Sequence, residues 1–323
     1  MNWNGRKVLV TGGAGFLGSN LCRALAKRGS TVSTVDAFLC EGGANAANLE
    51  GIQVNLVRAD IRDFDLRPLC EGVEVIFNLA ALTSHMGGQQ NPLADIAVNV
   101  VAQIRMIEAV REVAPEAIVV HASTRQFYGR AERLPVKEDQ LVTPTDTNGI
   151  TKFAGEQYWM VENRVTGQPV VSLRLTNCYG PRQRIRDARQ NFLGVWILSA
   201  IEGRPFEVWG GAQLRDLAYV DDVTDAFLAA AATPACHGHI FNIGGAPPLP
   251  VRDIADRLVH ASHNRTRYTV CEFPADRARI DIGSYYADDS SFREATGWTT
   301  KVGLEEGLCR TIEWFEPRIA AYR

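Results

Sequence analysis

Apolar and polar residues along the first half of the chain follow two alternating patterns. Short, nearly continuous apolar runs, typical of buried strands, are separated by stretches with the apolar spacing of amphipathic helices. This alternation predicts an α/β fold, with a parallel sheet and helices on both of its faces. The predicted strands are residues 7–11, 31–35, 53–57, 74–79, 117–121 and 170–175, and the predicted helices are residues 19–28, 92–113 and 149–166.

The regular alternation ends after Leu175. Residues 181–191 are rich in arginine and polar side chains, and only short elements follow, at residues 206–209, 221–232 and 251–262. We expect this half to form a smaller lobe over the carboxyl ends of the strands, where open parallel sheets bind ligands. The expected division is a first domain of residues 1–176, to which 217–243 return, and a second lobe of residues 177–216 and 244–323.

Three glycines, Gly12, Gly15 and Gly18, lie between the first predicted strand and the first predicted helix. Glycine permits a tight turn and lets backbone N–H groups approach a pyrophosphate at the positive end of the helix. The second strand leads into Asp36, whose carboxylate suits the ribose hydroxyls of NAD and would repel the extra phosphate of NADP. These features predict an NAD site, the alternative being a turn and helix cap without a ligand.

Composition narrows the function classes. Of the 323 residues, 46% are hydrophobic and 22% are charged, and the net charge is −3, so no nucleic-acid partner is expected. The first seven residues are polar, and no apolar run is long enough to span a bilayer. A cytoplasmic protein with no membrane partner is expected.

The cysteines are scattered and include no Cys-x-x-Cys pair, so neither a disulfide framework nor a zinc site is expected. His237 and His239 lack a neighbouring acidic or thiol cluster, so no metal is predicted there either. The seven cysteines are Cys22, Cys40, Cys70, Cys178, Cys236, Cys271 and Cys309.

A set of motifs runs through nearly the whole chain. They are residues 11–18, Asp36, 58–61, 78–81, 99–100, 123–129, Lys152, 174–181, 215–223, 286–288 and 297–298. In this order they resemble the extended short-chain dehydrogenases/reductases, and among these the NAD-dependent nucleotide-sugar epimerases and dehydratases. The resemblance implies a Rossmann-type doubly wound parallel sheet with a smaller C-terminal α/β substrate-binding lobe. It also implies NAD as the cofactor, a nucleotide-diphosphate sugar as the partner, and a homodimer.

The resemblance assigns binding roles residue by residue. Several of the residues assigned to the substrate have amide or guanidinium groups, which are suitable hydrogen-bond donors for a diphosphate. The cofactor set is Gly12, Gly15, Phe16 and Leu17 for the pyrophosphate, Asp36 for the adenosine ribose, Asp60 and Ile61 for adenine, and Leu79, Ala80, Ala81, Asn99 and Lys152 on the nicotinamide side. The substrate set is Ser84, Thr124, Asn177, Asn191 and Arg215, with Arg277 or Arg279 as a second guanidinium.

One position departs from the resemblance. The family's base is the tyrosine of a Tyr-x-x-x-Lys motif, whose two side chains lie on one helical face. Four residues before Lys152 this chain has Asn148, although residues 152–158 match the family closely. An amide can position a hydroxyl but cannot remove its proton, so turnover requires another base.

The pair after Thr124 also departs. Dehydratases of the family have Asp-Glu there, whereas this chain has Arg125 and Gln126. Neither residue can serve as the acid that expels water, so a 4,6-dehydratase is disfavoured. Arg125 is expected either to bind a sugar carboxylate, as in a uronic acid, or to make a salt bridge or a phosphate contact.

His85 lies in a loop, residues 83–88, that in the family faces the sugar. Histidine titrates near neutral pH and is therefore a candidate for the missing base, the alternative being a hydrogen-bonding residue only. Cys178, beside Asn177, is expected to pack in the core. The catalytic candidates are Thr124, Asn148, Lys152, His85 and Arg125.

Three functions follow from these residues. The favoured one is epimerisation at C4 of a nucleotide-diphosphate sugar through transient oxidation by NAD. The second is decarboxylation or another elimination on a nucleotide uronic acid, with Arg125 on the carboxylate. The third, which Asn148 favours, is a protein that binds NAD and a nucleotide sugar without turnover.

The homodimer is expected through helices 92–113 and 149–166. The first of these has an apolar stripe with helical spacing, and the alternative is that the stripe only covers the sheet. The stripe consists of Ile96, Val100, Ile104, Ile107 and Val110.

Overall fold

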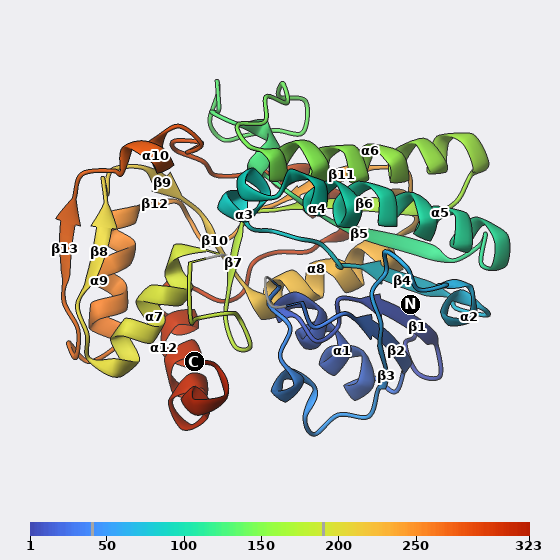
Figure 1. Cartoon of the computed structure of the whole chain (residues 1–323), viewed down its shortest axis with the longest axis horizontal. Helices are drawn as coiled ribbons and strands as arrows, with labels where there is room; N and C mark the ends of the chain where they lie inside the picture. Colours follow the sequence, from blue (N-terminus) through green and yellow to red (C-terminus); the bar gives the residue numbers. More distant parts are fainter. Residues whose placement is uncertain (40–41, 189–190) are drawn as a thin grey trace.

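The computed structural model describes residues 1–39, 42–188 and 191–323 (Figure 1). Cys40 and two residues of the arginine-rich segment 181–191 therefore lie outside the described ranges. Seven strands form one parallel sheet in the order β11-β6-β5-β4-β1-β2-β3, so the predicted α/β fold is confirmed. The strands are β1 (Lys7–Thr11), β2 (Thr31–Asp36), β3 (Asn55–Arg58), β4 (Val75–Asn78), β5 (Ile118–Thr124), β6 (Val170–Leu175) and β11 (Ile240–Ile243).

Strand β1 shows why the central strands are largely apolar. Val8 and Val10 pack into one hydrophobic cluster, and Leu9 packs into another on the opposite face of the sheet. Both faces are covered, so successive side chains are all buried, as is usual in parallel sheets. In the strand order β1 lies between β2 and β4, which is the point where such sheets bind ligands at their carboxyl ends.

Helices cover both faces of the sheet (Figure 1). Helices α1 (Phe16–Lys27) and α8 (Val220–Ala232) share a cluster with Val8 and Val10. On the other face, α4 (Pro92–Ile96), the π-helical turn η2 (Ala97–Val101) and α5 (Ala102–Val113) follow one another and run beside α6 (Thr147–Thr166). The predicted helix 92–113 is thus present, with a π-helical turn inside it.

The second lobe has its own core. Strands β8 (Phe206–Trp209) and β13 (Tyr268–Cys271) pair in parallel beside α7 (Phe192–Glu202), α9 (Val251–Ala261) and α12 (Leu304–Phe315). Two small sheets, β7 (Asn177–Tyr179) with β10 (Leu217–Tyr219) and β9 (Leu214–Arg215) with β12 (Leu249–Pro250), lie between this lobe and the main sheet. Strand β11 and helix α8 pack with the first lobe, whereas Leu217 and Tyr219 of β10 pack into the core of the second lobe.

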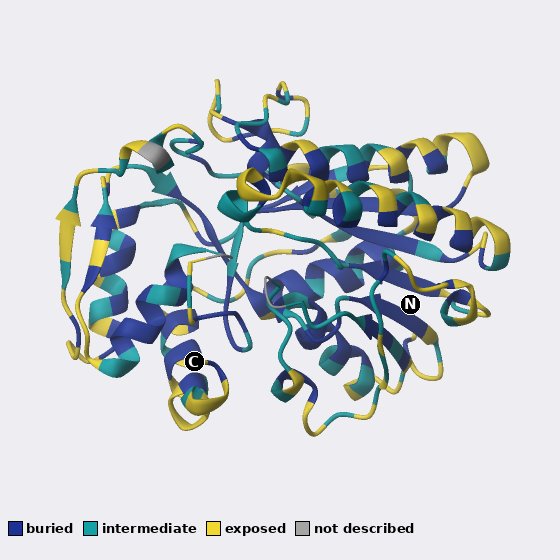
Figure 2. Ribbon diagram, viewed as in Figure 1, coloured by how far each residue is buried: buried dark blue, intermediate teal, exposed yellow. Residues whose placement is uncertain are grey.

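Short elements complete the fold, and most loops lie at the surface (Figure 2). No helix in the described ranges is both long and apolar enough to cross a membrane. Six cysteines within those ranges are free thiols, and no group of three or more His, Cys, Asp or Glu residues there could hold a metal ion. The short elements are η1 (Ala46–Leu49), α2 (Arg67–Cys70), α3 (His85–Gln90), η3 (Gln126–Tyr128), η4 (Pro234–Cys236), α10 (Ala275–Ala278), α11 (Ser290–Thr296) and η5 (Glu316–Ala321).

Candidate active site

A pocket follows the carboxyl ends of the central strands, from the loops after β1, β2 and β3 to those after β4, β5 and β6. Most of the residues predicted from the motifs meet in it, although they are far apart in the sequence. Predicted site residues in its lining are Gly12, Gly15, Phe16, Leu17, Asp36, Asp60, Ile61, Leu79, Ala80, Ala81, His85, Thr124, Arg125, Asn148, Lys152, Asn177 and Asn191.

The glycine loop shapes one end of the pocket. Gly12 has a φ of +72°, which favours glycine, and a Cβ there would lie 3.1 Å from the backbone of Ala80. A Cβ on Gly18 would lie 2.2 Å from the carbonyl oxygen of Gly12, so only glycine lets α1 pack this close to the loop. Gly15 caps α1 without a side chain, which leaves the N–H groups of the first helical turn for a ligand. This arrangement fits the pyrophosphate of NAD.

Two carboxylates line the adjacent part of the pocket. Asp36 accepts hydrogen bonds from the backbone N–H groups of Ala14 and Phe38, each at 3.0 Å. Burial raises the pKa of Asp36, and these two bonds oppose that rise. Asp60 accepts a hydrogen bond of 2.6 Å from Nη2 of Arg62, and its pKa is lowered mainly by this neighbour. Backbone bonds thus orient Asp36 at the pocket edge.

Lys152 lies on α6, is buried, and lines the pocket. Its Nζ donates a hydrogen bond of 2.7 Å to the carbonyl oxygen of Ala122, and burial lowers its pKa to about 8. The nearby loop is held by Thr11, whose Oγ1 accepts hydrogen bonds from the backbone N–H groups of Leu79 and Ala80 at 3.1 and 3.0 Å.

Asn148, one helical turn before Lys152, uses both of its amide hydrogens within the protein. Its Nδ2 donates to the carbonyl oxygen of Leu82 at 2.7 Å and to Oδ2 of Asp95 at 2.9 Å. The amide oxygen is then the group left to face the pocket, and it can accept a hydrogen bond but not a proton at ordinary pH. Asp95 is buried, which raises its pKa, and it was not among the predicted residues.

Arg125 is a buried cation with an unused donor. Its Nη2 donates to Oδ1 of Asn177 at 2.8 Å, and its guanidinium lies 4.9 Å from the ring centre of Tyr285. Within the described part of the chain, Nη1 is buried without a hydrogen-bond partner, and Arg125 makes no salt bridge. Of the roles expected for Arg125, a salt bridge within the described part of the chain is therefore not observed. A buried donor on a cation is costly unless a ligand, and above all an anion, completes it.

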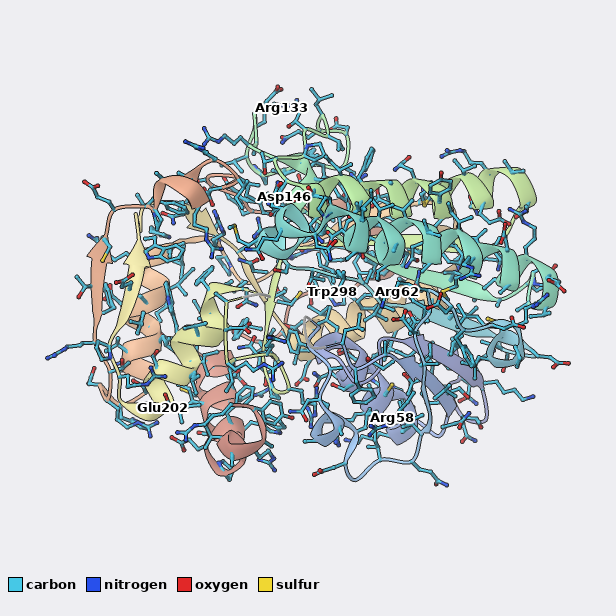
Figure 3. The ribbon with its side chains drawn as sticks, viewed as in Figure 1. Arg58, Arg62, Arg133, Asp146, Glu202 and Trp298 are labelled. Atoms are coloured by element: carbon cyan, nitrogen blue, oxygen red, sulfur yellow. The ribbon has the colours of Figure 1, made fainter. Side chains whose placement is uncertain are left out.

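His85 contacts a carboxylate that the sequence reasoning missed. Its Nδ1 lies 2.9 Å from Oδ2 of Asp146, at the start of α6 (Figure 3). Gln126 donates to the same oxygen at 3.0 Å, and the N–H of Gly149 donates to Oδ1 at 2.6 Å. Burial alone would raise the pKa of Asp146, but the contact with His85 and these hydrogen bonds lower it. The available signal was an aspartate just before a predicted helix, which indicates only an N-cap.

The opposite wall of the pocket is formed at the beginning of α7. Asn191 caps this helix, with Oδ1 accepting from the N–H of Gly194 at 3.1 Å and Nδ2 donating to the carbonyl oxygen of Cys178 at 2.9 Å. Burial raises the pKa of the Cys178 thiol to about 12, so it stays protonated. Thr124 ends β5, and its Oγ1 accepts a hydrogen bond of 3.2 Å from the N–H of Gln126.

Five predicted binding residues, counting both Arg277 and Arg279 as candidates for the second guanidinium, are not among the described residues that line the pocket. Asn99 exchanges hydrogen bonds with the backbone of Leu82, and Ser84 caps α3. Arg215 lies 3.3 Å from Asp281, and Arg279 is exposed. Their assigned contacts with cofactor or substrate stay predictions.

Comparison with known proteins gives one family. The family model described as "NAD dependent epimerase/dehydratase family" matches residues 8–244. The chain is 32% identical over 313 residues to a UDP-glucose 4-epimerase of Mycolicibacterium smegmatis, covering 96% of this chain and 98% of that protein.

Two solved structures of other proteins are similar to this chain over nearly its whole length. A UDP-glucose 4-epimerase from Thermotoga maritima, solved with UDP-glucose, has a TM-score of 0.87 at 27% identity, covering 97% of this chain and 99% of that one. A UDP-glucuronic acid 4-epimerase from Bacillus cereus, solved with UDP-glucuronic acid and NAD, has a TM-score of 0.83 at 28% identity, covering 96% and 99%.

Proposed function

The chain belongs to the NAD-dependent epimerase/dehydratase family, and from this premise we propose that it inverts C4 of a nucleotide-diphosphate sugar through transient oxidation. NAD is the cofactor of the family, so the predicted cofactor is confirmed. Bound NAD takes up a hydride from the sugar and returns it. The observation that carries the proposal is the single pocket that joins the glycine loop and Asp36 to Thr124, Asn148 and Lys152.

The residues at the sugar end support this reaction. In the proposal Lys152 holds the nicotinamide ribose, and Thr124 donates a hydrogen bond to the sugar. Asn177, Asn191 and the positive end of α7 bind the diphosphate, for which helix N-termini and amide groups are suited. In the proposal Asn148 occupies the place of the family's tyrosine and orients the reacting hydroxyl through its amide oxygen. The proton then has to be taken by a different group.

Arg125 supports a second candidate, in which the sugar is a uronic acid. Its unpaired Nη1 is a donor that a carboxylate would satisfy with a charge-assisted hydrogen bond. In this version the ketone formed at C4 also permits loss of the neighbouring carboxylate as carbon dioxide. Epimerisation and decarboxylation would share the same first step and differ in the product.

The test is turnover by the purified protein with NAD and a panel of nucleotide sugars, both neutral and uronic. Proton NMR of the products distinguishes a C4 epimer, in which the coupling constants of H4 change, from a pentose formed by decarboxylation. Formation of a C4 epimer supports the proposal, and a pentose product supports the second candidate. If NAD and a nucleotide sugar bind in calorimetry but no sugar is converted, the binding-protein hypothesis replaces both.

We also propose a homodimer through α4, α5 and α6. Ile107 and Val110 of the predicted stripe pack in the core, so that part of the stripe covers the sheet. Helices α4 and α6 and the π-helical turn η2 nevertheless expose large apolar side chains, which a second copy would shield. These are Leu93 (75% exposed) and Ile96 (40%) on α4, Val101 (48%) on η2, and Ile150 (58%), Tyr158 (45%), Val161 (44%) and Val165 (75%) on α6.

The division into two lobes is proposed with the bounds predicted above. Its support is that the chain forms separate hydrophobic clusters, one around the main sheet and one around Trp196, Phe206 and Leu258. Four residues depart from the predicted bounds, since the second cluster includes Leu217 and Tyr219 and the first includes Phe292 and Trp298. The cytoplasmic location expected from the sequence stays a prediction.

A further inference from the structure

Few titratable groups reach the sugar end of the pocket. Among its described lining residues they are His85, Arg125, Lys152 and Cys178. Burial raises the pKa of Cys178 to about 12, so its thiol keeps its proton near neutral pH. A guanidinium does not act as a base in proteins. The candidates that remain are His85 and Lys152.

Lys152 is poorly placed to accept a proton. Its ammonium group donates to the carbonyl oxygen of Ala122 at 2.7 Å, a contact that requires the N–H. Even with its pKa lowered to about 8, most of it carries the proton at neutral pH. His85 is the group left, and its surroundings differ from those of a solvated loop histidine.

The contact with Asp146 selects one tautomer of His85. Nδ1 of His85 has no hydrogen-bond partner in the described structure, so its 2.9 Å contact with Oδ2 of Asp146 is an electrostatic one. A carboxylate this close favours the proton on Nδ1, which leaves the lone pair on Nε2. Nδ1 is buried, while the side chain as a whole is 36% exposed and His85 lines the pocket. A neutral imidazole in this tautomer can accept a proton from the pocket, and Asp146 stabilises the resulting cation.

The carboxylate of Asp146 is itself fixed. Gly149 N–H donates to one oxygen, and Gln126 and His85 contact the other, so the group cannot rotate freely. A glutamate at position 126, as in the dehydratases that the sequence resembles, would place a second negative charge against this oxygen. The amide of Gln126 instead supplies a donor. Gln126 stands where the dehydratases have glutamate, and Asn148 stands where the family has tyrosine. Both differences are consistent with a site in which His85 and Asp146 replace the tyrosine.

We propose that His85, positioned by Asp146, takes the proton of the reacting sugar hydroxyl in place of the family's tyrosine. The O–H bond breaks toward Nε2 of His85, and a C4–O double bond forms as the hydride leaves C4 for the bound cofactor. The same proton returns to the oxygen when the hydride returns to C4. In this scheme Asn148 accepts a hydrogen bond and takes no proton. The inference rests on the proposed function, because it needs a sugar that is oxidised.

The first test needs neither substrate nor cofactor. Nitrogen-15 NMR of the labelled protein reports which ring nitrogen of His85 carries the proton, with His85→Gln assigning the signal. We expect protonated Nδ1 and unprotonated Nε2. In Asp146→Asn the amide still caps α6, because asparagine is an equally good N-cap. With its oxygen toward Gly149, its NH2 group faces Nδ1, so the proton should move to Nε2.

The second test is turnover of the same variants. Both His85→Gln and Asp146→Asn should lose about a hundred- to ten-thousand-fold in kcat, because one removes the base and the other leaves it in the wrong tautomer. The double variant should be no slower than the worse single variant by more than about threefold, as expected of two groups that act as one unit. Calorimetry should give an unchanged Kd for NAD, and Asp139→Asn, an exposed carboxylate on the preceding loop, should match the unaltered protein.

The outcomes separate the two proposals. A wild-type rate in His85→Gln, or an Nε2-protonated tautomer in the unaltered protein, overturns the role of His85 while leaving the epimerase proposal in place. An unaltered protein that binds NAD but converts no sugar overturns the proposed function, and this inference falls with it.

Discussion

Replacing Arg125 by methionine separates substrate recognition from folding. The methionine keeps an unbranched side chain over the ring of Tyr285 and removes the guanidinium. In the folded protein without ligand, Arg125→Met removes the hydrogen bond from Nη2 to Asn177. It also removes the buried donor Nη1, which has no hydrogen-bond partner among the described residues. These effects oppose each other, since a hydrogen bond to a charged group contributes about 1.5–3 kcal/mol and an unsatisfied buried donor costs a similar amount. The free energy of unfolding should therefore change by no more than about 1 kcal/mol.

Substrate binding should respond much more strongly. If a uronic carboxylate pairs with the guanidinium, its removal leaves that carboxylate desolvated without a partner, at a cost of roughly 2–5 kcal/mol. At about 1.4 kcal/mol per factor of ten, this corresponds to a loss of roughly thirty-fold to several thousand-fold in kcat/KM. A neutral nucleotide hexose has no such carboxylate, and its kcat/KM should change by less than about threefold.

The assay is the ratio of kcat/KM for a uronic and a neutral nucleotide sugar, measured for the unaltered protein and for Arg125→Met. Arg130→Met is the matched control, because Arg130 is an exposed arginine whose hydrogen bonds go to backbone oxygens of Asp281 and Ala278. Equal losses for both sugars would refute carboxylate recognition and favour a contact with the diphosphate. Thermal unfolding of the variant excludes a general loss of structure.

Four further predictions follow. The protein should bind NAD more tightly than NADP, and Asp36→Ala should weaken NAD binding and narrow the preference; equal or tighter NADP binding in calorimetry would contradict the role of Asp36. Light scattering at micromolar concentration should give a dimer, and Val165→Asp should give a monomer if α6 lies in the interface; a monomeric unaltered protein would refute the dimer. Asn148→Tyr should raise sugar oxidation, seen as NADH absorbance, and no change would mean that the pocket has diverged beyond its base. Burial lowers the pKa of Lys152 from 10.5 to about 8, so between these pH values the folded state binds fewer protons than the unfolded state. The free energy of unfolding should therefore rise with pH in this range, by at most about 3 kcal/mol. Lys152→Met should not show this rise.

The parts of the site that the sequence predicts are those with local physical causes. Gly12 and Gly18 are recognisable because a side chain at either position would collide with nearby backbone, so glycine spacing alone marks the loop. The central strands β1 and β4 are predictable because both faces of the sheet are buried there, which makes these strands largely apolar, whereas the edge strand β3 is only partly buried. Lys152 was placed by one helical turn of spacing. Each of these signals is contained within a few adjacent residues.

The other parts depend on contacts between distant segments. Asp95 reaches Asn148 and Asp146 reaches His85 only because α4, α3 and α6 pack side by side, and an isolated aspartate before a helix indicates a cap and nothing more. Within the apolar stripe of helix 92–113, Ile107 and Val110 pack in the core whereas Ile96 is exposed, so helical spacing alone does not tell which part covers the sheet and which part is open to a second copy.

The distribution of hydrogen bonds around Asn148 explains why this residue is compatible with a working site. A tyrosine at this position would lack the NH2 group that joins the carbonyl oxygen of Leu82 to the carboxylate of Asp95, and the buried carboxylate would lose a donor. The hydrogen bond from Asn148 thus favours the negative charge of Asp95, whereas we propose that His85, beside Asp146, is the base. In the proposed mechanism these two features divide between them what a single tyrosine would supply, since Asn148 orients the hydroxyl and His85 takes its proton.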